Sequence, residues 1–168
     1  MAKIKKSVKG KTPPESGKLP TCVAFLLCER VIISTDGTAS IIRIVDTVGV
    51  PEDPARKKND YIELGGIQTF VAIKRIDSDP VDLVVSCIDR RGKRSPVGIL
   101  KNRPEVTAQG GTNAIAPLRL RWSGEGMYWL ELATADGRLV GKTPFQVVSG
   151  SPEQVAEKIK KANQNESR

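Results

Sequence analysis

The chain has 168 residues, of which 39% are apolar and 27% charged, and it contains no histidine. This length suits one core of ordinary size and is short for two domains. The absence of histidine excludes Ser-His-Asp and Cys-His catalysis and every histidine-bearing metal site. The net charge of +8 is uneven, because residues 1–18 hold six lysines and one glutamate and so carry +5 of it.

Residues 1–18 form a basic arm of Lys, Ser, Gly and Pro that we expect to be disordered, because it cannot bury enough apolar surface. Its lysines are candidate anion contacts, since phosphate contacts supply affinity without sequence readout. The arm has no apolar stretch typical of a signal peptide. These lysines are Lys3, Lys5, Lys6, Lys9, Lys11 and Lys18.

The composition changes at Leu19, and residues 19–150 form the predicted folded domain. The stretch "TCVAFLLCERVII" is apolar on both faces from Cys22 to Cys28, which is typical of a strand covered on both sides. Asp36-Gly37 separates it from "ASIIRIV", and Asp-Gly between two such runs predicts a β-hairpin.

Two further hairpin turns are predicted at Asp89–Gly92 and Asp136-Gly137. Apolar residues alternate in "LRLRW" (118–122) and "YWLEL" (128–132), the pattern of half-buried strands. We count about eight short strands and one longer loop at about 47–66. The predicted fold class is all-β: a single antiparallel β-sandwich, immunoglobulin-like or related, with a short C-terminal helix.

Residues 151–168 are expected to form that short helix and a tail. Ser151 is a candidate N-cap, and Pro152 suits the first helical position. Val155 and Ile159 lie four residues apart, so the helix has one narrow apolar stripe.

The first hairpin resembles the opening hairpin of a bacterial family of small all-β proteins, a domain of unknown function. The closing stretch "GMYWLELATADGRLVGKTPFQV" is similar to that family's last hairpin, whereas "IQTFVAIKRI" has Phe70 in place of a tryptophan. The resemblance covers about residues 22–148 and implies an all-β sandwich without catalytic residues to carry over. The matching positions are Cys28, Glu29, Arg30, Val31, Ile32, Asp36, Gly37, Ser40, Ile41 and Ile42.

Three cysteines, Cys22, Cys28 and Cys87, are an odd number and form no CxxC pair, which argues against a disulfide scaffold and favours a reducing compartment. We expect Cys22 and Cys28 to be unreactive and to lie on one side of their strand, and Cys87 to be labelled faster. No metal and no cofactor is predicted. The expected location is cytoplasmic.

Four residues are candidates for a partner surface. Glu29 and Arg30 interrupt an apolar strand, which indicates either that the strand leaves the core there or that the charges recognise a partner. Trp129 should point outward beside Met127, either covered by the C-terminal helix or forming part of an interface; the helix is the favoured option.

The sequence therefore predicts a non-catalytic binding or structural-interaction module whose partner is another protein or a further copy of the chain. An enzyme is not expected, and no segment predicts a membrane span. The alternative is a nucleic-acid-associated protein that grips phosphate through the arm at residues 1–18.

Overall fold

The computed structural model describes residues 19–36, 38–57, 60–74, 82–100 and 111–165, so the basic arm and its six lysines lie outside it. Within this part the single helix is too short and too polar to cross a bilayer. The described elements are β1 (Thr21–Ile33), β2 (Ala39–Ile44), β3 (Thr47–Pro51), β4 (Tyr61–Lys74), β5 (Leu83–Ile88), β6 (Arg94–Leu100), β7 (Gly111–Arg121), β8 (Gly126–Thr134), β9 (Leu139–Gly150) and α1 (Pro152–Asn165).

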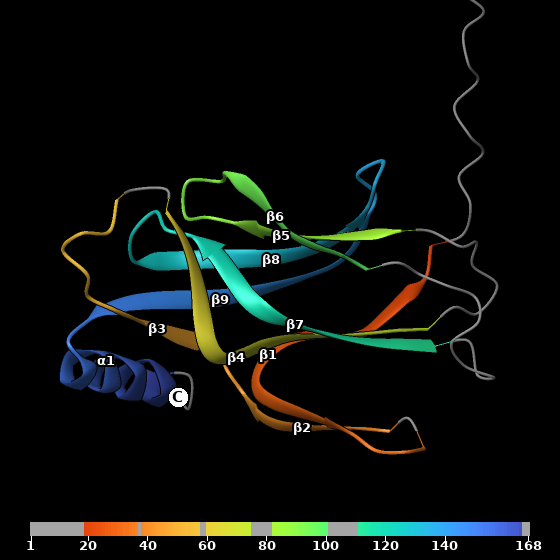
Figure 1. Ribbon diagram of the computed structural model, residues 1–168, viewed down its shortest axis with the longest axis horizontal. Helices are drawn as coiled ribbons and strands as arrows, with labels where there is room; N and C mark the ends of the chain where they lie inside the picture. The colour runs from red at the N-terminus through yellow and green to blue at the C-terminus, as the bar shows by residue number, and fades with distance from the viewer. Residues whose placement is uncertain (1–18, 37, 58–59, 75–81, 101–110, 166–168) are drawn as a thin grey trace, which may run out of the picture.

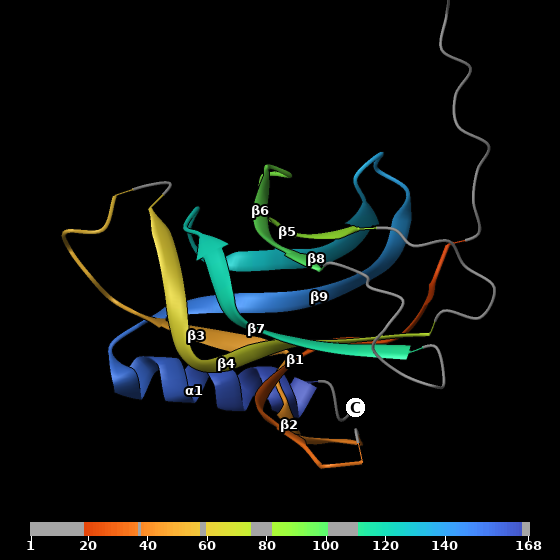
Figure 2. The same cartoon turned by 45° about the vertical axis from the view of Figure 1, so that its right-hand side comes forward.

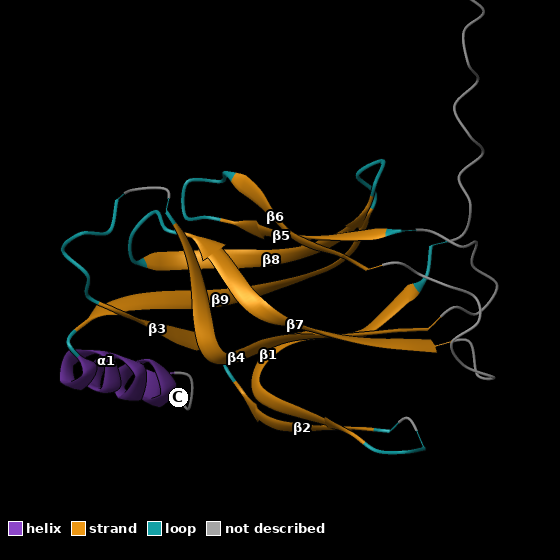
Figure 3. Cartoon of the chain, viewed as in Figure 1, coloured by secondary structure: helices purple, strands orange, loops and turns teal. Residues whose placement is uncertain are grey.

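The strands form two sheets, ordered β2-β1-β4-β7 and β3-β9-β8-β5-β6 (Figure 1). The prediction of a mostly β chain with one C-terminal helix is confirmed (Figure 3). The first sheet is curled, and Figure 2 shows β4 and β7 bending together out of its plane. The bend coincides with an irregularity in β4 between Leu64 and Gln68, where Gly66 has a φ of 80° that favours glycine.

Purely antiparallel pairing was expected, and this is wrong at one position. β3 runs parallel to β9, with Thr47 opposite Gln146 and Pro51 opposite Gly150. Only two residues separate β2 from β3, yet β3 joins the other sheet. The backbone N–H of Gln146 donates to the carbonyl of Asp46 at 2.8 Å, which secures this crossing.

Both sheets contribute to one main core. The alternation predicted in β7 is confirmed at Leu118 and Leu120, which are no more than 1% exposed while Arg119 between them is exposed. In β8 only the inward side chains follow the prediction, because Glu131 on the other face is buried as well. Such burial provides most of the stability of a fold with few aromatic residues. The core residues are Leu27, Leu64, Leu118 and Leu120 from the first sheet, with Val48, Val50, Cys87, Tyr128, Leu130, Phe145 and Val147 from the second.

The predicted hairpins are confirmed in the described residues that flank their turns. Asp36 accepts hydrogen bonds from the backbone and hydroxyl of Thr38, and the Asp89 carboxylate accepts two backbone N–H groups of its own turn. Gly92 and Gly137 have φ values of 79° and 88°, which explains the glycine at both turns.

The predicted long loop at about 47–66 is wrong, because it contains β3 and the first residues of β4, and nine strands are described where about eight were expected. β3 is short and contains glycine and proline, which weaken a strand signal. Its Val48 and Val50 are nevertheless at most 1% exposed, since β9 and the core cover them.

Helix α1 begins as predicted. Gln154 N–H donates to the Ser151 hydroxyl at 3.4 Å, and the Gln154 side chain accepts from the Ser151 N–H at 3.0 Å, which is a capping box. The helix lies against β3 and β9. Its apolar stripe, Val155 and Ile159, packs over Gly49 of β3, where the missing side chain lets the helix approach closely.

Candidate functional site

The β1–β2 hairpin leaves the core at Glu29 and Arg30. Leu27 and Cys28 are 2% and 0% exposed, whereas the next two residues are exposed charges. Beyond them the strand is apolar again, but none of the described elements covers Ile32 and Ile33. The interpretation that β1 emerges from the core at Glu29 and Arg30 is therefore consistent with their exposure.

The projecting part of the hairpin carries four half-exposed isoleucines, which we call the isoleucine patch: Ile32, Ile33, Ile42 and Ile44, at 44%, 47%, 43% and 59% exposure. Ten large apolar side chains are exposed in the described part of the chain, and these four lie together on one hairpin. Ile32 and Ile33 are neighbours in a strand, so the patch occupies both faces of the hairpin. A cluster of this kind indicates an interaction surface.

β2 is also an edge strand whose single described partner strand is β1, so one row of its backbone N–H and C=O groups faces away from the sheet. Its sequence "ASIIRI" contains no proline and one charge, Arg43.

The other three edges are protected. β3 has five residues, ends in a proline and lies beneath α1; β6 contains Arg94 and Pro96; β7 contains Pro117 and two arginines. Proline and charge are the usual means of preventing strand addition, and β2 lacks them along most of its length.

A groove of about 510 Å³ separates this hairpin from helix α1. Its apolar lining consists of Ile44 and Val45 beside the hairpin, Val155 and Ile159 of α1, and Ile67 of β4, and polar groups supply the larger part of its surface. The groove adjoins the end of β2, and Ile44 belongs both to its lining and to the isoleucine patch.

Charge at this site is balanced. Arg43 Nη1 lies 3.0 Å from Glu29 Oε1 at the rim of the groove, and both side chains are well exposed. Arg43 has a φ of 52°, a left-handed conformation that is rare for arginine and ends the regular part of β2. Asp46 and Thr47 supply the remaining polar lining.

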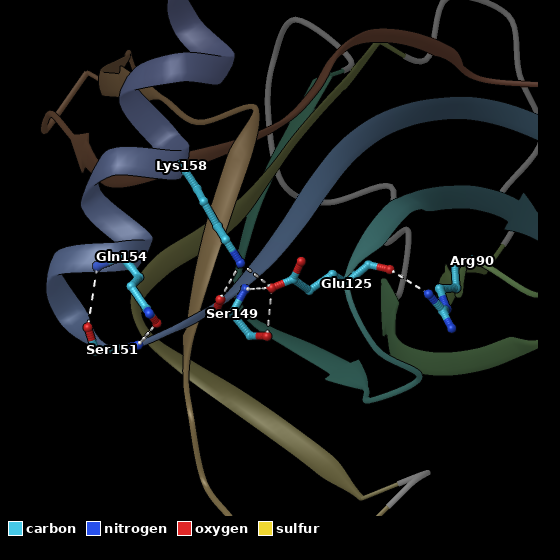
Figure 4. Close-up of polar contacts among 6 residues, drawn as sticks. All are labelled: Arg90, Glu125, Ser149, Ser151, Gln154 and Lys158. Carbon is cyan, nitrogen blue, oxygen red and sulfur yellow. Dashed lines mark hydrogen bonds and ion pairs between the residues drawn. The ribbon is translucent and has the colours of Figure 1, made fainter.

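Helix α1, the second wall of the groove, is held at its base by a polar network (Figure 4). Lys158 Nζ lies 2.7 Å from Glu125 Oε1 and donates to the Ser149 carbonyl at 2.8 Å. The same carboxylate oxygen accepts the Ser149 N–H and hydroxyl, while Arg90 donates to the Glu125 carbonyl. The Lys158 ammonium holds the pKa of Glu125 below its usual value.

The structure does not bring the four predicted partner residues together. Glu29 and Arg30 belong to the hairpin, but Met127 and Trp129 lie on β8 of the other sheet. Met127 is 48% exposed. Trp129 is half-buried, with the Lys142 ammonium 4.5 Å from its ring centroid, and α1 lies against β3 and β9. The expected cover by the helix is thus replaced by a lysine of β9.

Sequence reasoning missed the isoleucine patch. It interpreted the run from Cys22 to Cys28 as covered on both faces, but Val23 is 55% exposed, and no pattern in the sequence says where the cover begins and ends. A usable signal was present in the hairpin: both strands stay apolar after Glu29 and Arg30, although strands that leave a core normally become polar on one face.

Two further basic clusters in the sequence, at 56–58 and 90–94, begin with arginines that approach the same loop of the fold. The Arg56 guanidinium lies 5.4 Å from the Trp122 ring, and Arg90 Nη1 donates to the carbonyl of Glu125, three residues further along. Both arginines are thereby engaged by the protein itself. The predicted anion contacts of the arm lie outside the described residues.

The thiols differ from expectation. Cys87 is 2% exposed, and burial, followed by the neighbouring Asp89, raises its pKa to about 12. This burial argues against the faster labelling expected at Cys87. A register shift after Cys22 turns that thiol toward Phe25 and the second core cluster, so Cys22 and Cys28 do not share one side. Burial also raises the pKa of both.

Among the described residues, no three acidic or thiol side chains gather as a metal site. No family model matches the chain, and no curated protein is detectably similar to it.

Proposed function

We propose that the chain is a non-catalytic protein-interaction module, built as a single β-sandwich, that binds its partner through the β1–β2 hairpin. The observation that carries the proposal is the β2 edge, unpaired on one side, nearly free of charge and flanked by the isoleucine patch. The partner contributes an extended apolar segment that adds to the sheet as a further strand.

The energetics favour strand addition over a purely apolar contact. Fully burying one isoleucine gains about 1.5–3 kcal/mol, so four that are each about half exposed gain roughly 3–6 kcal/mol together. Association costs about 4–15 kcal/mol in lost freedom. Burial of the patch therefore offsets this cost only at the low end of its range, and the backbone hydrogen bonds of β2 add to the gain.

The shared core supports the sandwich. The two sheets bury their inward side chains against one another in one cluster, as the two layers of a sandwich do. Curling of the first sheet leaves the hairpin outside this contact, which explains how a well-packed domain exposes four isoleucines.

The test compares two charge substitutions at sheet edges. Ile42→Lys places a charge on β2, and Ile99→Lys places one on β6, where Ile99 is 63% exposed. Each protein captures binding partners from a lysate of cells that express it, and a differently tagged copy of the chain counts as a partner. We expect wild type and Ile99→Lys to retain the same proteins and Ile42→Lys to lose them.

Equal retention by Ile42→Lys would overturn the proposal. Trp129→Ser serves as a third arm, because it tests the surface predicted from sequence. Loss of partners with Trp129→Ser alone would place the interface on the other sheet.

A further inference from the structure

We propose that the strand that adds to β2 is the β2 strand of a second copy of this chain, paired antiparallel across a two-fold axis at Ile41. This inference rests on the proposed function and specifies its partner. It would join two four-stranded sheets into one continuous sheet through the two unprotected edges.

The direction of the backbone groups in β2 determines which residues can pair. Ser34 N–H donates to the Thr38 carbonyl at 2.9 Å, and the register continues without a shift through Ile33–Ala39 and Val31–Ile41. Hydrogen-bonded positions alternate along an antiparallel ladder. Ala39 and Ile41 therefore turn their N–H and C=O groups away from β1, toward an incoming strand.

These outward groups suit a self-complementary pair. With the axis at Ile41, this residue pairs with its own copy, and Ala39 lies opposite the partner's Arg43, where the regular part of β2 ends. The two Arg43 residues then lie four residues apart along the strand direction, about 14 Å. This exceeds the Debye length of about 8 Å at physiological salt, so the like charges repel only weakly.

The distribution of charge favours a second copy. The chain carries +8 overall, which opposes self-association, but residues 29–44 contain two acidic and two basic side chains and are neutral. Two copies can thus approach through the hairpins without bringing net charge together.

The position of the isoleucine patch on both faces of the hairpin also favours a second copy as the partner. By the β1–β2 register Ile32 and Ile42 lie on one face of the hairpin and Ile33 lies on the other, so a body docking on one face would leave part of the patch exposed. A strand added at the edge extends both faces at once. A second copy brings its own isoleucines to both faces of the continuous sheet, and Ile42 of each copy lies on the strand at the junction.

The first experiment measures mass by sedimentation velocity over a wide range of protein concentrations. We expect wild type and Ile99→Lys to form a dimer reversibly. Ile41→Lys should weaken dimerisation by at least about 100-fold, because it places two like charges opposite each other and removes the central apolar pair.

The second experiment tests the register by disulfide trapping. Residues in a hydrogen-bonded antiparallel pair have Cα atoms about 5.5 Å apart, within the disulfide range of about 4.4–6.8 Å. Ile41→Cys should therefore cross-link to itself under mild oxidation. Ile42→Cys should not, because its two copies would be offset by two residues and about 8 Å apart. Wild type controls for the native thiols.

A monomer at all concentrations, with no trapped dimer of Ile41→Cys, overturns the second copy as partner. A monomeric chain can still capture a different protein, which the Ile42→Lys variant no longer binds and the Ile99→Lys variant still binds. In that case the proposed function stands, with that protein as the partner. If Ile42→Lys retains every protein, the proposed function falls too. A dimer that cross-links through Ile42→Cys and not Ile41→Cys overturns the proposed register.

Discussion

Gly49 of β3 is the position where one methyl group should loosen helix α1. A Cβ at this position would lie well inside the contact distance of Val155 Cγ1 and 3.6 Å from Ile159 Cδ1. Non-bonded carbons prefer a separation of about 3.5–4.0 Å, so the substitution Gly49→Ala requires the helix to move by about 1 Å or more. Val155 is β-branched and has little freedom to rotate away.

Two estimates limit the stability that Gly49→Ala should cost. Overpacking of this kind typically destabilises by about 1–3 kcal/mol. The cost is also limited by what docking contributes, since the helix can detach, and half-burial of Val155 and Ile159 contributes about 1.5–3 kcal/mol. The estimates agree, so Gly49→Ala should lower Tm by roughly 2–12 °C in a chain of this size.

The assay is thermal unfolding followed by circular dichroism, with Gly98→Ala as the matched control. Gly98 also lies in a strand, but no atom lies within 4 Å of its added Cβ, so that variant should be neutral or up to about 1 kcal/mol more stable. The double variant Gly49→Ala/Val155→Ala should recover part of the loss, because it removes the clashing methyl groups. Equal stability of Gly49→Ala and Gly98→Ala would refute the packing argument.

Three other outcomes follow from the geometry. Tyr128→Phe should cost about 1–3 kcal/mol in urea denaturation, because its fully buried hydroxyl bonds a backbone N–H and a carbonyl in the loop after β7; an unchanged midpoint would contradict this. The lowered pKa of Glu125 means that its contribution to holding α1 is present above pH 4.5, its ordinary pKa, and is lost as the pH falls through the lower folded value. Proteolysis of α1 should thus accelerate on acidification. The Glu125→Gln variant should already be cleaved faster at neutral pH, and its cleavage rate should not show this acceleration. Native-state labelling with a thiol reagent should modify Cys22 before Cys87, whose thiol is buried with a pKa of about 12; the reverse order would mean that β5 opens locally.

Local chemistry in the sequence determined the turns, the inward faces and the start of the helix. Asp89 and Asp136-Gly137 lie in turns because short side-chain bonds and positive φ are properties of a few adjacent residues. The alternation around Tyr128 and the Ser151 cap are local in the same sense. Such features need no knowledge of the rest of the chain.

Tertiary structure alone decided which apolar residues stay exposed. Leu27 and Ile33 lie in the same strand and have similar side chains, yet one is 2% and the other 47% exposed. The difference is whether the opposite sheet extends over that part of β1. The tertiary structure also decided that β3 joins β9 in parallel, since such pairing depends on residues about 100 positions apart. The candidate binding surface therefore exists because the second sheet ends before it covers the hairpin. The alternation of residues along one strand does not predict where that sheet ends.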